Sequence, residues 1–124
     1  MIGDKTDDVY FKKLFASIDA MDTESFLGFI APDATFRFGS SPAVNGHAEI
    51  RASVEGFFAS FAALKHDLQR LVADGDTVVC EGEVIYTSHD GRNITLPFAN
   101  IFEIDDGVIS VYRVYIDIGP LFAA

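Results

Sequence analysis

The sequence contains no tryptophan, only one cysteine and few basic residues. Nine Lys and Arg stand against nineteen Asp and Glu, which gives a formal net charge of −10. A negative field repels phosphate backbones and anionic lipid headgroups, so we expect no nucleic acid and no membrane among the partners. Because Cys80 has no second cysteine to pair with, no internal disulfide can form, which fits the reducing cytoplasm. We therefore expect a cytoplasmic protein.

Long apolar runs and metal-ligand clusters are also missing from the sequence. No segment approaches the apolar length that crosses a bilayer. Asp4, Asp7 and Asp8 lie where a secretion signal would need basic and then apolar residues. The three His show no ligand spacing, so we expect no metal, and no other cofactor is predicted.

The sequence is rich in hydrophobic residues, which make up 49% of its 124 residues and include twelve Phe. A chain of this length is expected to form one domain, residues 1–124, with a real core. Phenyl rings carry no polar atoms, so their number predicts a core or a pocket lined by apolar rings.

Hydrophobic periodicity predicts helices in the first half of the chain. Spacings of three and four place one apolar stripe on a first helix: Phe11, Leu14, Phe15, Ile18 and Met21. Asp22 or Thr23 caps a short second helix, which carries Phe26, Leu27, Phe29 and Ile30 and must end before Pro32. A short strand over 34–38 follows. Residues 39–46 form a loop, and a third helix begins near His47.

Alternating apolar residues and acidic glycine turns predict a strand meander in the second half. The expected strands cover residues 65–73, 77–87, 93–104 and 108–118, and Asp-Gly pairs mark several turns. Helices followed by such a meander indicate an α+β domain, with helices against one face of a curved sheet that encloses a hollow. Because strand 77–87 is apolar on both faces, we expect the outer face to be covered in a homodimer.

Four short motifs carry a family resemblance. They are Ala-Pro-Asp-Ala-Thr-Phe at 31–36, Gly46 with Ile50-Arg51, Asp106-Gly107, and Tyr-Arg-Val-Tyr-Ile-Asp at 112–117. With them the chain resembles the SnoaL-like family of the nuclear transport factor 2-like (ketosteroid isomerase-like) superfamily. The resemblance implies a cone-shaped α+β fold with three N-terminal helices packed on a curved, mostly antiparallel sheet. Members include polyketide cyclases, ketosteroid isomerases, epoxide hydrolases and a dehydratase, and others only bind ligands or partners.

The resemblance also allows known active sites to be compared with this sequence. The three catalytic positions of ketosteroid isomerases match Leu14, Phe38 and Asn100, and two of these are apolar, which argues against classical isomerase chemistry. Scytalone dehydratase has a His at the start of the strand after the third helix, and the matching residue is His66.

Limonene epoxide hydrolases provide a second comparison. Their catalytic Arg and two acids match Glu81, Glu83 and Val114, so only one carboxylate remains, at Glu83. Their water-holding residues match Phe36 and Phe38. Epoxide opening needs both an acid and a base, so this pattern argues against that reaction.

Polar residues that could face the hollow are the candidates for chemistry. They are His66, Glu81, Glu83, Asn100 and Tyr112. We predict His66 and Glu83 as an acid–base pair, with Asn100 as a donor to a developing oxyanion. The predicted ligand-binding residues are Leu14, Phe36, Phe38, Glu81, Phe98, Asn100, Phe102, Tyr112 and Val114.

The direction of Glu81 and Glu83 is left open by the sequence. Hydrophobicity alone points both to water, because Val78, Cys80 and Val84 form the better apolar face, whereas the resemblance points them inward. Three functions follow as hypotheses. The chain is a cofactor-free enzyme acting on a polyketide- or terpenoid-like molecule, a non-catalytic binder of a small hydrophobic ligand, or a dimeric association domain.

Overall fold

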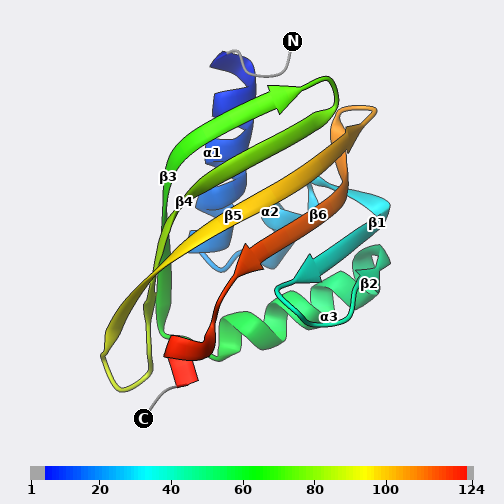
Figure 1. The fold of residues 1–124 in the computed structure, drawn as a ribbon. Coiled ribbons are helices and arrows are strands. Elements are labelled where there is room, and N and C mark those ends of the chain that lie inside the picture. The colour runs from blue at the N-terminus through cyan, green and yellow to red at the C-terminus, as the bar shows by residue number, and fades with distance from the viewer. Residues whose placement is uncertain (1–4, 123–124) are drawn as a thin grey trace.

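The computed structural model describes residues 5–122, which form three helices and a six-stranded sheet (Figure 1). The elements are α1 (Lys5–Asp19), α2 (Thr23–Leu27), β1 (Ile30–Phe38), β2 (Val44–Asn45), α3 (Gly46–Ala59), β3 (Ala63–Asp74), β4 (Thr77–Thr87), β5 (Asn93–Asp105), β6 (Val108–Ile116) and the 3-10 turn η1 (Gly119–Phe122). None of the helices in this part of the chain is long and apolar enough to cross a membrane.

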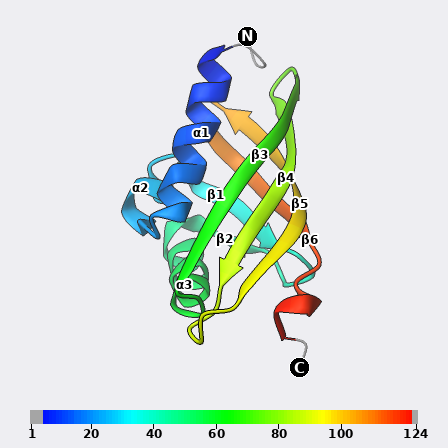
Figure 2. The same cartoon turned by 90° about the vertical axis from the view of Figure 1, so that its left-hand side faces the viewer.

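The sheet has the strand order β2-β1-β6-β5-β4-β3. Strand β1 runs parallel to β6, and the other neighbouring strands are antiparallel. The helices lie on one face of the sheet, and the curved strands wrap around them (Figures 1 and 2). The predicted α+β fold of three helices on a curved, mostly antiparallel sheet is therefore confirmed.

A bulge at the β3–β4 pair accompanies the sheet curvature. The register passes from Leu68 opposite Gly82 to Arg70 opposite Glu81, so Gln69 is an extra residue on β3. Such a bulge bends a strand and increases its twist. The backbones approach closely here, since a Cβ on Gly82 would lie 2.0 Å from the carbonyl oxygen of Asp67. Only glycine fits this position without moving the backbone.

The boundary between α2 and β1 differs from the sequence prediction. Helix α2 ends at Leu27, and Ile30 is the first residue of β1 instead of the last residue of the helix. The cause is a long-range contact: Ile30 pairs with Ile109 of β6, and the Ile109 amide donates to the Phe29 carbonyl at 3.0 Å. Local periodicity carries no information about such pairing.

The core lies between the helices and the concave face of the sheet. Four members of the predicted stripe are buried there, Phe11, Leu14, Phe15 and Ile18, whereas Met21 follows the end of α1 and is half-buried. Aromatic rings connect α1 to the sheet. The ring centroid of Phe102, on β5, lies 4.8 Å from that of Phe11 on α1 and 4.6 Å from that of Tyr112 on β6. This packing fills the end of the hollow beneath the first half of α1.

Candidate functional site

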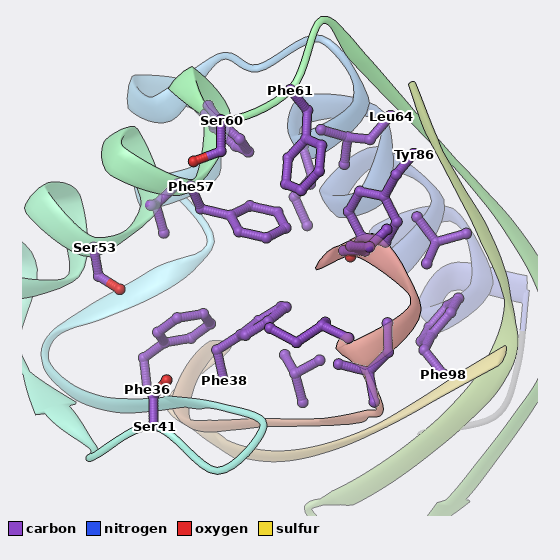
Figure 3. A pocket seen from close by; sticks show the side chains of 18 of the residues that line it. Phe36, Phe38, Ser41, Ser53, Phe57, Ser60, Phe61, Leu64, Tyr86 and Phe98 are labelled. Carbon is purple, nitrogen blue, oxygen red and sulfur yellow. The ribbon is translucent and has the colours of Figure 1, made fainter. Parts of the chain in front are cut away.

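The other end of the hollow is an open cavity of about 270 Å³. Its walls come from the concave face of the sheet, from α3 and from the C-terminal segment around η1 (Figure 3). The lining is mostly apolar: Ile18, Phe26, Phe36, Phe38, Pro42, Val54, Phe57, Phe58, Phe61, Leu64, Val84, Phe98, Val114, Ile116, Ile118, Leu121 and Phe122. Its polar side chains are those of Ser41, Ser53, Ser60, His66, Tyr86, Asn100 and Tyr112.

Aromatic rings hold one another in place around the cavity. Phe57 of α3 contacts Phe38 of β1 at a centroid distance of 4.9 Å and Phe61 at 5.2 Å, and Phe61 in turn lies 4.9 Å from Tyr86 (Figure 3). Offset and edge-to-face contacts of this kind contribute about 1 kcal/mol each beyond the burial of area. The cavity therefore has rigid, ring-covered walls suited to a flat apolar molecule.

An imidazole and a carboxylate form a dyad at the cavity wall. Nδ1 of His66, on β3, lies 2.6 Å from Oδ1 of Asp19, the last residue of α1. The backbone N–H of His66 also donates to the Asp19 carboxylate, at 3.0 and 3.1 Å. The side chains are only 11% and 25% exposed. A carboxylate at Nδ1 favours the tautomer with the proton on that nitrogen, in which Nε2 is the acceptor nitrogen of the ring.

Two phenyl rings hold the imidazole from its sides. The centroid of His66 lies 4.9 Å from that of Phe15 and 5.2 Å from that of Phe98. Phe15 belongs to α1 and Phe98 to β5, so the ring is held between the helix layer and the sheet. Packing against these two rings together with the hydrogen bond between Nδ1 and Asp19 orients the imidazole, as acid–base chemistry requires.

Asn100 is the buried polar residue of the cavity wall. It is 2% exposed, and among the described residues its Oδ1 is a buried side-chain atom without a hydrogen-bond partner. It lies opposite Cys80 in the β4–β5 pair. Burial raises the pKa of the Cys80 thiol to about 12, although hydrogen bonding from Asn100 acts in the opposite direction. Cys80 is therefore a neutral, buried thiol, and Asn100 is a polar group that still needs a partner.

Two tyrosines bring hydroxyl groups to the same cavity. Burial raises the pKa of both Tyr86 and Tyr112 above the usual value of a phenol, and the nearby Cys80 and Tyr86 add to the effect at Tyr112. Both phenols are therefore protonated at neutral pH. Within the described part of the chain neither hydroxyl is hydrogen-bonded, so each can donate to a ligand oxygen.

The structure corrects the placement of Glu81 and Glu83. Both lie on the outer face of β4, where every second residue is exposed, while Val84 and Tyr86 face inward. Glu81 lies 3.8 Å from the Arg70 guanidinium, and Glu83 is 3.5 Å from the amide of Gln69. The predicted pairing of Glu83 with His66 is therefore wrong. The alternation of apolar and polar residues along β4 predicted that both carboxylates point to water, and this prediction is confirmed.

Three predicted ligand-binding residues lie outside the cavity: Glu81 on the outer face, and Leu14 and Phe102 in the core. The latter two are fully buried, and Phe102 packs against Phe11 where α1 covers the sheet. Leu14 and Phe102 belong to the hydrophobic core between α1 and the sheet. The remaining predicted residues line the cavity: Phe36, Phe38, Phe98, Asn100, Tyr112 and Val114, together with His66.

Asp19 was not among the residues singled out by the sequence. It follows directly after Ile18, the fourth member of the apolar stripe on α1, and it lies 47 residues from His66. A carboxylate beside the apolar stripe of a helix can indicate a functional residue. The residue that this carboxylate contacts, however, depends on how α1 packs on β3, which the sequence of α1 does not contain. Among the side chains that the structure describes, residues 9–122, no cluster of three or more metal-ligating groups occurs.

Comparison with known proteins adds a family and a set of structural relatives. The sequence model of the SnoaL-like domain matches residues 11–112. No curated protein matches the chain. Among solved structures, a nuclear transport factor 2-like protein of unknown function from Burkholderia pseudomallei is similar, with 17% identity, 92% of each chain covered and a TM-score of 0.83.

Two further structures show the same fold. A protein named as a SnoaL-like polyketide cyclase, from Jannaschia sp., has 19% identity over 92% of this chain and 87% of its own, with a TM-score of 0.82. TerC, co-crystallized with polyporic acid, has 21% identity over 92% of this chain and 93% of its own, with a TM-score of 0.81. At these identities the similarity demonstrates a shared fold.

Proposed function

The chain belongs to the SnoaL-like domain family, and we propose that it is a cofactor-free proton-transfer enzyme for an apolar, oxygenated small molecule. The observation that carries the proposal is the 2.6 Å contact between Asp19 and His66 at the wall of a mostly apolar cavity. Similar folds occur in proteins named as polyketide cyclases and as an epoxide hydrolase. Those names support small-molecule chemistry as a class and not any one reaction.

His66 acts as the general base in this proposal. Its Nε2 takes a proton from a ligand carbon next to a carbonyl, so that a C–H bond breaks and an N–H bond forms. Asp19 stabilises the resulting imidazolium through Nδ1–H. The electron pair moves onto the carbonyl oxygen, where the Tyr86 and Tyr112 hydroxyls can donate hydrogen bonds. Returning the proton to a different atom completes an isomerisation, and the enolate can instead attack an electrophile on the same ligand.

The apolar walls support this chemistry by lowering the local dielectric constant around the base. Charge–dipole interactions are stronger in a low-dielectric cavity than in water. The same walls also suit the alternative function, a binder that only sequesters a hydrophobic ligand, and binding alone requires no oriented base. The dyad is the observation that favours the enzyme.

Exchange of carbon-bound protons for deuterium tests the proposal without knowledge of the natural substrate. The probe is 2-tetralone in D₂O, with exchange next to the carbonyl followed by proton NMR. We expect the protein to accelerate exchange over buffer. His66→Gln should lower the catalysed rate by about 10²-fold or more, since a positioned base contributes about 10²–10⁴-fold. Asp67→Asn, on the outer face next to His66, is the control and should keep the rate.

The outcomes separate the enzyme from the binder. If 2-tetralone raises the melting temperature but no exchange above buffer occurs, the protein is a binder and the enzyme proposal is wrong. If His66→Gln keeps the full rate, the base is another group.

A further inference from the structure

The mouth of the cavity lies where its lining residues are exposed to solvent. The exposed lining residues are Ser41, Pro42, Ser53, Ser60 and Phe122. The first two follow β1, the two serines come from α3 and the position after it, and Phe122 belongs to η1, drawn in red beyond the end of β6 in Figure 1. The C-terminal segment therefore forms one side of the opening through which a ligand must pass.

The chain leaves the sheet after β6. Ile116 is the last residue of β6, and it pairs with Phe98 of β5. Pro120 lacks the backbone N–H that a further bond to a neighbouring strand would need. Among the described residues, no hydrogen bond connects residues 118–122 with α3 or with the sheet. This segment can therefore move away from the body of the protein without losing a hydrogen bond to either.

One buried side chain holds the segment against the cavity. Leu121 is 8% exposed and belongs to the hydrophobic core, whereas Phe122 next to it is 73% exposed. Within the segment, the Gly119 N–H donates to Oδ1 of Asp117 at 2.9 Å, and the Leu121 N–H donates to the carbonyl of Ile118 at 3.0 Å. These local bonds keep the turn together when it moves as a unit. Opening therefore costs mainly the burial of Leu121.

We propose that residues 117–122 form a lid on the cavity, which turns about Asp117 and is held closed by Leu121. In the closed position Ile118, Leu121 and Phe122 complete the cavity wall. In the open position these three side chains leave the mouth, and a ring-sized molecule can enter. The lid controls how fast molecules enter and leave, whatever happens to them inside. The inference therefore goes beyond the proposed function and does not depend on it.

A thiol in the cavity measures the opening of the lid without knowledge of the ligand. Val114→Cys, combined with Cys80→Ala, places a single thiol at a half-buried position of the cavity wall. The probes are N-phenylmaleimide, which is ring-sized and uncharged, and methyl methanethiosulfonate, which is much smaller. Leu121→Ala should accelerate labelling by N-phenylmaleimide at least about tenfold, because the loss of buried apolar surface shifts the lid towards the open position. Labelling by the smaller reagent should stay nearly the same, since it passes the mouth while the lid is closed.

Asp117→Ala is a second test, and it leaves the cavity lining intact. Asp117 is exposed and does not line the cavity, and its carboxylate accepts the Gly119 N–H. Loss of this hydrogen bond should loosen the turn and raise the N-phenylmaleimide rate about threefold, the size expected for one hydrogen bond. Leu68→Ala is the matched control for Leu121→Ala. Leu68 is a half-buried leucine that packs on the core outside the cavity, so the labelling rate should not change.

Labelling of Cys80 in the otherwise unchanged chain reports global unfolding, because its thiol is buried and does not line the cavity. We expect Leu121→Ala to accelerate labelling in the cavity far more than labelling of Cys80. Equal acceleration of both thiols would overturn the inference, since the variant would then loosen the whole fold. Unchanged labelling of the cavity thiol in Leu121→Ala and Asp117→Ala would overturn it as well. Selective acceleration without proton exchange in 2-tetralone would contradict the proposed function and leave the lid in place.

Discussion

Asp19 holds His66 through both its ring and its backbone. The carboxylate lies 2.6 Å from Nδ1, and it accepts the His66 backbone N–H at 3.0 and 3.1 Å. The two residues come from different layers, the end of α1 and the start of β3. The carboxylate thus binds the imidazole at Nδ1 and the adjacent backbone at the same time, which gives the ring a set orientation on the cavity wall, as acid–base chemistry requires.

Replacing Asp19 should therefore change the tautomer of His66. We expect ¹⁵N NMR of the neutral wild-type imidazole to show the Nδ1–H tautomer, with the proton on the nitrogen that faces Asp19. In Asp19→Asn the neutral amide no longer stabilises the imidazolium, so the exchange rate of 2-tetralone should fall at least about tenfold. Asp67→Asn removes an exposed carboxylate nearby and should change neither observable. An unaltered tautomer and rate in Asp19→Asn would show that the carboxylate has only a structural role.

Gly82 should tolerate no side chain. Its Cβ would lie 2.0 Å from the Asp67 carbonyl oxygen, so Gly82→Ala must displace the backbone at the bulge. We expect a loss of about 3 kcal/mol in the free energy of unfolding, measured by urea denaturation. The control is Gly56→Ala in α3, where nothing lies within 4 Å of the added methyl and a gain of about 0.5–1 kcal/mol is expected. Equal stability of the two variants would contradict this account of the β3–β4 bulge.

Stability should decrease steeply at alkaline pH. Burial raises the pKa of Cys80 from 9.0 to about 12 and that of Tyr10 from 10.0 to about 12. Above pH 9 the unfolded chain releases the Cys80 proton while the folded chain keeps it, so the free energy of unfolding falls as pH rises towards 12. Each such group contributes a slope of about 1.4 kcal/mol per pH unit.

Cys80→Ala isolates the contribution of the thiol. The variant should show a shallower loss of stability between pH 9 and pH 11 than the wild type, and the same pH dependence below pH 8. Identical slopes in the two proteins would mean that Cys80 ionises as readily in the folded state as in the unfolded chain.

The outer face of the sheet should form a homodimer. Val72, Val79, Ile85 and Tyr115 expose between 37% and 52% of their surfaces there, on the face opposite the helices. Light scattering should give twice the chain mass of 13.5 kDa at micromolar concentration. Val79→Lys should shift the mass towards the monomer, because a charge is costly in an apolar interface. A measured mass of one chain for the wild-type protein at every concentration would contradict this prediction.

The sequence was sufficient for the fold but only partly for the site. The spacing of Phe11, Leu14 and Phe15 predicted α1, and alternation with Asp-Gly turns predicted the meander, because both signals are local. The resemblance pointed to His66, which lines the cavity. For Glu83 the resemblance gave the wrong direction. The matching position in a relative pointed Glu83 into the cavity, whereas the alternation of apolar and polar residues along β4 points it to water, as the structure shows. Asp19 was missed because its role exists only through a contact 47 residues away.

The central claim is that Nε2 of His66 faces the reacting carbon of a ligand in the cavity. It is tested most directly by a crystal structure with 2-tetralone bound. The account predicts that the exchangeable carbon lies about 3–3.5 Å from Nε2, a distance suited to proton transfer, while Nδ1 keeps its contact with Asp19. A structure in which the ketone lies in the cavity with that carbon far from Nε2, or in which Nε2 is bound to a protein group, would contradict the claim.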